Sequence, residues 1–158
     1  MMPMTLERSA LPKAERERHG DLLNKLLRGE RSAVETYEQA LEKFDTDDTV
    51  RQLVDIRNDH ASAVQLLTDQ VMALGVEPEL SSGLWGSFVQ AVTSAAKLLG
   101  PQSVIVALHE GEEHGILAYE NAMNNTELSH DCLMLIHRDL IPLANRHVST
   151  LERLLRDY

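Results

Sequence analysis

The sequence has little cysteine, few aromatic residues and no long hydrophobic run. Cys132 is the single cysteine of the 158-residue chain, which excludes an internal disulfide and fits a reducing compartment. Aromatic residues make up only 4% of the chain although hydrophobic residues make up 43%, so the core must consist mainly of Leu, Val, Ile and Ala. A chain of this length can bury a stable hydrophobic core without disulfide bonds.

Basic charge and membrane-spanning patterns are also missing, and this excludes several classes of partner. There are 15 lysines and arginines against 25 aspartates and glutamates, a formal net charge of -10, whereas nucleic-acid binding needs a basic stripe. No stretch approaches the roughly 20 apolar residues of a membrane span, and residues 1–20 lack the apolar run of a secretory signal. We therefore predict a cytoplasmic protein without a nucleic-acid or membrane partner.

Several catalytic motifs are missing as well. The sequence has no glycine-rich phosphate loop, no cysteine pair with zinc spacing, and no motif for a serine or cysteine nucleophile. Enzyme classes that depend on these motifs are therefore excluded, and the sequence by itself assigns no reaction.

The hydrophobic periodicity is helical along the whole chain, which predicts an all-α protein. The expected long helices cover residues 12 or 19 to 44, 46–74, 101–124 and 129–158. Residues 76–100 would form a long crossover that contains a short apolar helix at about 84–99, and residues 1–11 a flexible or loosely packed segment. Two helical hairpins joined by one crossover predict an antiparallel four-helix bundle, a single domain over residues 1–158.

Signals at the helix ends support these boundaries. Asp45 or Thr46 is the expected N-cap of the second helix, and its first turn carries two aspartates where the helix dipole favours acids. Gly75 follows the second helix, and Gly100 precedes the third helix. Pro142 lies inside the fourth helix and is expected to bend it.

The second half of the sequence repeats the first. Under a shift of 82 residues, the motif Gly-Glu-x6-Tyr-Glu at 29–38 aligns without a gap with the same motif at 111–120. Under a shift of 87 residues, Asn-x-His at 58–60 aligns with Asn-x-His at 145–147. Such a repeat predicts that the two hairpins have one shared role and are related by approximate two-fold symmetry.

One polar residue interrupts the apolar stripe of each predicted helix. In chain order these residues are Glu30, His60, Glu112 and His147. Glu30 and His60 are each about 22 Å of helix away from the turn that joins their helices, and the second pair is placed in the same way. The four side chains are therefore expected in one layer at mid-bundle. Burying a lone carboxylate is very costly, so the layer needs a metal ion, another cation or protonation.

At these residues the sequence resembles the ferritin-like superfamily, and bacterioferritin in particular, where a Glu on the first and third helices is followed seven residues later by a Tyr. Glu30 with Tyr37 and Glu112 with Tyr119 match that feature. Taken as a whole, the chain resembles a bacterial ferritin-like four-helix-bundle family of unknown function. The resemblance implies the fold of two hairpins and a crossover.

The resemblance also implies a metal site that is smaller than the site of the di-iron members. In those members the second and fourth helices each carry Glu-x-x-His, and the Glu bridges the two metals. Arg57 and Ala144 occupy the two bridging positions in this chain. The resemblance therefore implies a degenerate site for a single metal and speaks against iron oxidation and iron storage.

In a first interpretation, the polar layer binds one divalent metal, Fe, Mn or Zn. Tyr37 and Tyr119 would donate hydrogen bonds to the ligating carboxylates across the bundle. His109, three residues before one of the glutamates, is an additional and weaker candidate. The expected ligands are Glu30, His60, Glu112 and His147. A link to metal or oxidative stress follows from the resemblance alone.

In a second interpretation, no metal is bound. Arg57 would pair with Glu30 or Glu112, and the histidines would donate hydrogen bonds to the carboxylates, so that the layer only fixes helix register. The protein would then be a structural or interaction bundle. Its short crossover helix, with Trp85 and Phe88, would cover one end of the bundle or form a homodimer contact.

Overall fold

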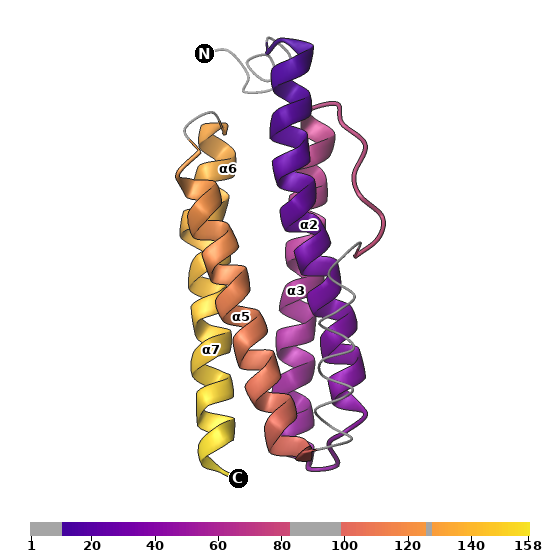
Figure 1. Cartoon of the computed structure of the whole chain (residues 1–158), viewed down its shortest axis with the longest axis vertical. Coiled ribbons are helices and arrows are strands. Elements are labelled where there is room, and N and C mark those ends of the chain that lie inside the picture. The colour runs from indigo at the N-terminus through magenta and orange to yellow at the C-terminus, as the bar shows by residue number, and fades with distance from the viewer. Residues whose placement is uncertain (1–10, 83–98, 126–127) are drawn as a thin grey trace.

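The computed structural model describes residues 11–82, 99–125 and 128–158. These residues form helices and no strand, which confirms the predicted all-α class. Figure 1 shows the long helices lying side by side, with α2 next to α3 and α5 next to the last helix. The helices are α2 (Lys13–Leu41), α3 (Asp47–Ala73), α5 (Pro101–Met123), and a fourth built from α6 (His130–Leu135), the π-helical turn η2 (Ile136–Leu140) and α7 (Ile141–Arg156).

Two predicted features lie outside the described residues. They are the short apolar helix with Trp85 and Phe88, and the N-terminal segment up to residue 10. None of the described helices combines the length and the apolar character that crossing a membrane requires.

The helix ends lie close to the predicted positions. Thr46 is the N-cap of α3 by its backbone, although its side chain makes no capping hydrogen bond among the described residues. Gly75 follows α3 with φ 72°, and Gly100 precedes α5 with φ 86°, both in the left-handed region that favours glycine. Ser129 caps α6 by accepting a hydrogen bond from the backbone N–H of Cys132 at 3.2 Å.

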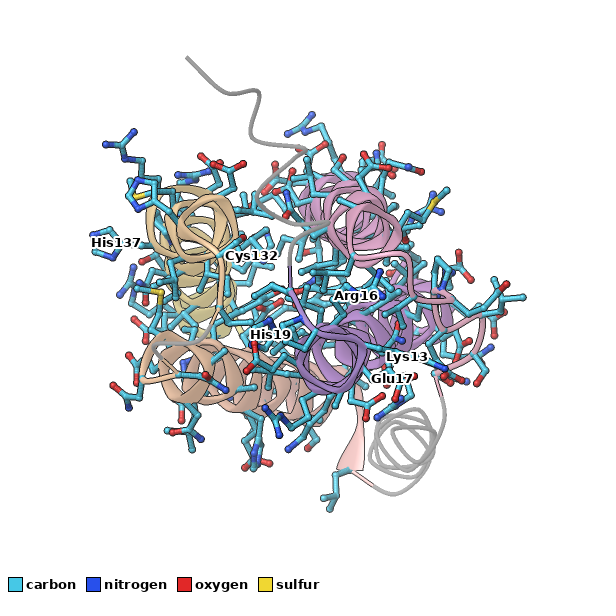
Figure 2. The ribbon with its side chains drawn as sticks, turned by 90° about the horizontal axis from the view of Figure 1, so that it is seen from above. Lys13, Arg16, Glu17, His19, Cys132 and His137 are labelled. Carbon is cyan, nitrogen blue, oxygen red and sulfur yellow. The ribbon has the colours of Figure 1, made fainter. Side chains whose placement is uncertain are left out.

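The buried apolar side chains form two separate clusters along the bundle. One contains Leu27, Leu67 and Ile136, and the other contains Leu53, Ile105 and Leu151. Tyr119 belongs to the first cluster and Tyr37 to the second. The polar residues that interrupt the helical stripes therefore lie between two apolar cores. Seen along the bundle, His19 and Cys132 face the interior, whereas His137 points away from it (Figure 2).

The fourth helix departs from the α-helix immediately before Pro142. Residues Ile136–Leu140 form a π-helical turn, and the backbone N–H of Ile141 bonds to the carbonyl of Ile136. Pro142 has no N–H to donate to the carbonyl of residue 138, and its ring would clash with that carbonyl in a regular α-helix. A wider turn at this place avoids the clash. The sequence predicted a bend at Pro142; the structure has a π turn that ends at Leu140, seven residues or about two helical turns before His147.

Candidate metal centre

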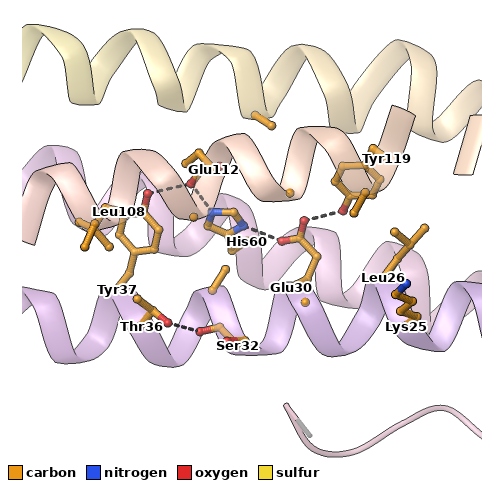
Figure 3. A pocket seen from close by; sticks show the side chains of 17 residues that line it. Lys25, Leu26, Glu30, Ser32, Thr36, Tyr37, His60, Leu108, Glu112 and Tyr119 are labelled. Carbon is orange, nitrogen blue, oxygen red and sulfur yellow. Dashed lines mark hydrogen bonds and ion pairs between the residues drawn. The ribbon is translucent and has the colours of Figure 1, made fainter. Parts of the chain in front are cut away.

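His60 on α3 lies between two carboxylates that come from two other helices. Its Nδ1 atom is 2.5 Å from Oε2 of Glu30 on α2, and its Nε2 atom is 2.7 Å from Oε1 of Glu112 on α5. All three side chains are buried. Figure 3 shows the imidazole ring between the two carboxylates. A single imidazole thus contacts carboxylates from both α2 and α5.

Each carboxylate also accepts a hydrogen bond from a tyrosine of the opposite half. The Tyr37 hydroxyl on α2 donates to Oε1 of Glu112 at 2.7 Å, and the Tyr119 hydroxyl on α5 donates to Oε1 of Glu30 at 2.5 Å. The expected reach of both phenols across the bundle is therefore confirmed. Together with His60, these residues form one continuous chain of buried hydrogen bonds, drawn as dashed lines in Figure 3.

His147 on α7 connects this chain to the protein surface. Its Nδ1 atom is 3.4 Å from Glu112, and its Nε2 atom is 2.9 Å from Oδ2 of Asp59 on α3. The side chain of Asp59 is 44% exposed, whereas the side chain of His147 is 4% exposed. Glu112 therefore contacts both histidines, and Asp59 forms the solvent-facing end of the network.

Three members of the network form a group that can hold a metal ion. One ligand atom each from His60, Glu112 and His147 lies within 4.8 Å of the other two, and all three residues are buried. Metal bonds of about 2.0–2.2 Å place two ligand atoms at most about 4.4 Å apart. The separations of the three atoms are therefore close to those between ligands of a single ion.

The charges in the network have marked effects on proton affinity. Burial by itself would lower the pKa of His60, but the carboxylates of Glu112 and Glu30 outweigh burial and raise this pKa well above its ordinary value. Burial acts to raise the pKa of Glu112, yet the adjacent His60 and His147 hold this pKa well below its usual range. The result is an imidazolium that donates from both ring nitrogens.

Both tyrosines keep their protons. Burial, followed by the charge of Glu112, raises the pKa of Tyr37, and burial together with the charge of Glu30 raises the pKa of Tyr119. The phenols therefore act only as hydrogen-bond donors to the carboxylates at neutral pH.

Two residues from the sequence prediction lie away from the network. Arg57, which was expected to pair with Glu30 or Glu112 in the metal-free interpretation, instead places Nη1 3.3 Å from Oε1 of Glu38 on α2. His109 contacts Glu113 at 3.1 Å and Glu152 at 3.2 Å, and both of these glutamates are exposed. The guanidinium of Arg57 therefore pairs with Glu38 and is not the cation beside Glu30 or Glu112.

Asp59 is the one network member that the sequence prediction missed. It directly precedes His60 in the sequence, and a neighbour in sequence points to a different face of a helix. Its contact with His147 could have been found only by asking which acidic residue of α3 faces α7. The useful signal is an aspartate adjacent to a predicted histidine ligand, with a second such histidine on another helix.

Comparison with known proteins identifies a family but no function. The chain matches the family model described as Domain of unknown function (DUF2383) over residues 19–125. The matched range contains Glu30, His60 and Glu112, and it ends before His147. No curated protein and no solved structure matches the chain.

Proposed function

This chain belongs to the DUF2383 family of domains of unknown function, and from that premise we propose that it binds one divalent metal ion between His60, Glu112 and His147. The observation that carries the proposal is the buried group of two imidazoles and one carboxylate with ligand atoms within 4.8 Å of one another. Two nitrogen ligands and one oxygen ligand suit Zn, Fe or Mn.

The remaining residues of the network would orient the ligands. Glu30 accepts from Nδ1 of His60, which leaves Nε2, the atom nearest Glu112, to bind the ion. Asp59 accepts from Nε2 of His147, which leaves Nδ1 to bind in the same way. Carboxylates that hold the second nitrogen of a ligating histidine are typical partners in metal sites. In this assignment Glu30 orients His60 and does not bind the metal, whereas the sequence analysis predicted Glu30 as a fourth ligand.

Metal binding must displace the proton that His60 carries on Nε2, because an imidazole binds a metal only in its neutral form. The ion would replace that proton as the positive charge beside Glu112. Glu112 would thus have a positive charge beside it both with and without metal, so the fold would not need the ion in order to form.

We also propose the ferritin-like, antiparallel arrangement with a crossover between α3 and α5. It is supported by four long helices, by the short connection between α2 and α3, and by Glu-x6-Tyr on α2 and on α5. A role in metal or oxidative stress, and a location in the cytoplasm, stay predictions of the same kind.

The alternative function is that of a metal-free structural or interaction bundle, and one observation favours it. Both nitrogens of His60 already contact carboxylates, so the polar layer is satisfied without an ion. In this case the layer would fix the register of the helices, and the protein would act through association, with a homodimer as one outcome.

Metal analysis separates the two functions. The full chain, purified without an affinity tag or chelator and then reconstituted with Zn²⁺, Mn²⁺ or anaerobic Fe²⁺, should retain about one equivalent of metal after desalting. His60→Ala and His147→Ala should each lose it. His109→Ala is the matched control, because His109 contacts only surface glutamates among the described residues, and it should retain the metal. Wild-type protein that retains none after reconstitution would refute metal binding and support the metal-free alternative.

A further inference from the structure

A cavity of about 80 Å³ lies between α2 and α5, beside the chain of hydrogen bonds through His60 (Figure 3). A single water needs only about 10–15 Å³ measured in this way, and an engineered cavity of about 150 Å³ holds benzene. The cavity is therefore too large for one water and suits an organic molecule smaller than benzene, of about four heavy atoms.

Small residues at equivalent positions of the two halves create the cavity. Under the shift of 82 residues, Gly29 aligns with Gly111 and Ala33 aligns with Gly115, and all four line the cavity. A Cβ atom added at Gly115 would meet no atom within 4 Å apart from its chain neighbours and the backbone of its own helix. These four residues are only partly buried, so the cavity reaches the surface between α2 and α5. Its apolar wall comes from both halves of the sequence.

The buried polar end of the cavity, formed by Glu30, Glu112, His60 and the two tyrosines, offers hydrogen-bond acceptors and no spare donor, while the exposed Lys25 also lines the cavity. The hydroxyls of Tyr37 and Tyr119 donate to carboxylates, and both nitrogens of His60 contact carboxylates. The carboxylates of Glu30 and Glu112 can each accept about four hydrogen bonds, so acceptor positions remain. A ligand must therefore bring its own donor, and an anion would meet two carboxylates.

The charges around the cavity indicate what kind of donor the ligand has, and the metal group indicates which carboxylate accepts from it. Two buried carboxylates share the single imidazole of His60, and the charge of Lys25 is exposed to solvent, so a cation is favoured over a neutral donor at the buried end of the cavity. Glu30 lines the cavity but stands outside the group of His60, Glu112 and His147. It is therefore available to a second ligand whether or not a metal is bound.

We propose that the cavity between α2 and α5 binds a small primary alkylammonium ion, with the ammonium on Glu30 and an alkyl chain of one to three carbons against Ala33 and Gly115. The ammonium supplies the donors that the cavity lacks, and the alkyl chain fills the apolar wall. This inference does not depend on the metal site, because Glu30 and the small residues are present without it.

The test uses the full chain stripped of metal with a chelator, titrated with propylammonium and followed by calorimetry and by saturation-transfer NMR. Saturable binding at one site is expected, with 1-propanol at least tenfold weaker and propionate not bound. These three probes have nearly the same size and differ in charge. Equal or tighter binding of 1-propanol, or no binding of propylammonium, would overturn the inference.

A filling variant shows whether the ligand occupies this cavity. Gly115→Leu should weaken propylammonium binding at least tenfold, and it should fold, since glycine is a poor residue within a helix and the added Cβ has open space. Asn121→Leu is the matched control, because it adds the same side chain at an exposed position of α5, and it should bind as wild type does. Unchanged binding in Gly115→Leu would place the ligand elsewhere and refute the assignment. A failure of the metal experiment leaves this outcome unaffected.

Discussion

The two halves of the molecule have equivalent tyrosines and glutamates but use their histidines differently. Tyr37 donates to Glu112, and Tyr119 donates to Glu30, so the phenols cross between the halves in the same way. His60 lies between both carboxylates, whereas His147 contacts one carboxylate at 3.4 Å and turns its other nitrogen to Asp59. Two pairs of short matching motifs have therefore produced an asymmetric site.

The cause of the asymmetry lies outside the repeated residues. The shift of 87 residues that aligns His147 with His60 also aligns Arg146 with Asp59. Asp59 can accept a hydrogen bond from His147, while the equivalent Arg146 is an exposed cation and has no acceptor to offer to His60. The group that can hold a metal therefore lies around Glu112, which contacts both histidines, and away from Glu30.

The largest effect should come from removing the histidine that both carboxylates share. Without metal, His60→Ala should lower the free energy of unfolding by about 3–5 kcal/mol, because two buried carboxylates lose their cation. His147→Ala should cost about 1–3 kcal/mol, because Glu112 keeps His60 and Tyr37 as partners. Urea unfolding at pH 7 in the presence of a chelator measures both. If His147→Ala is as damaging as His60→Ala, the asymmetry described above is wrong.

The tyrosines test the part of the site that is equivalent in the two halves. Tyr37→Phe and Tyr119→Phe should each lower the free energy of unfolding by about 1.5–3 kcal/mol, the range for a hydrogen bond to a charged group. The two losses should agree within about 0.5 kcal/mol, because both phenols are buried and donate to equivalent carboxylates. Thermal and urea unfolding of the metal-free variants give the comparison. A clear difference would mean that the halves diverge at the phenols as well.

The pH dependence of stability should also follow His60. Its pKa in the folded chain is raised above the unfolded value, so its contribution is complete below about pH 6.5 and is lost as the pH rises through the folded pKa. We expect the stability of the metal-free protein to fall above neutral pH, with a slope of at most about 1.4 kcal/mol per pH unit.

His60→Gln should abolish this decline, and His147→Gln, which leaves His60 and both carboxylates in place, should keep it. Glu112, whose pKa is lowered on folding, acts in the other direction and destabilises the protein only as the pH falls into the acid range. Urea unfolding between pH 6 and 9 reports the slope. A decline that survives in His60→Gln would have to come from another group.

The smallest effect on stability is expected at Asp59. Its side chain is 44% exposed, so Asp59→Asn should cost at most about 1 kcal/mol. If the metal binds, the same change should weaken metal affinity by about 10- to 100-fold, the usual effect of removing a partner of a ligating histidine. Competition with a chelating dye measures the affinity. Asp55→Asn, one turn earlier on α3 and exposed, is the control and should bind as wild type does.

Much of the site could be predicted because the position of each polar residue follows from the apolar stripe of its own helix. Glu30, His60, Glu112 and His147 stand out as polar residues in apolar stripes, and all four are buried as expected. The outward position of Arg57 could not be predicted in this way. It lies three residues before His60 on the same helix, and the sequence does not show that Glu38 on α2 is within reach.

The fourth helix shows the same limit in its backbone. A constant spacing of seven residues predicts Leu133, Leu140, His147 and Leu154 on the core side. In the structure Cys132 and Ile136 are buried and Leu133 is only partly buried, while Leu140 and His147 remain buried. The π turn at 136–140 changes the helical register before Pro142. Pro142 predicted that the helix departs from regular geometry, but the kind of turn depends on what the helix packs against.

The sequence by itself determined the helices, the height of each polar residue along its helix, and the face on which it lies. These quantities follow from a rise of about 1.5 Å and a rotation of about 100° per residue. The tertiary structure decided which imidazole lies between the carboxylates, that Asp59 joins the network, and that small residues of α2 and α5 leave a cavity. Those outcomes depend on the rotation and spacing of separate helices and on side-chain rotamers. The periodicity of residues within one helix carries no information about either.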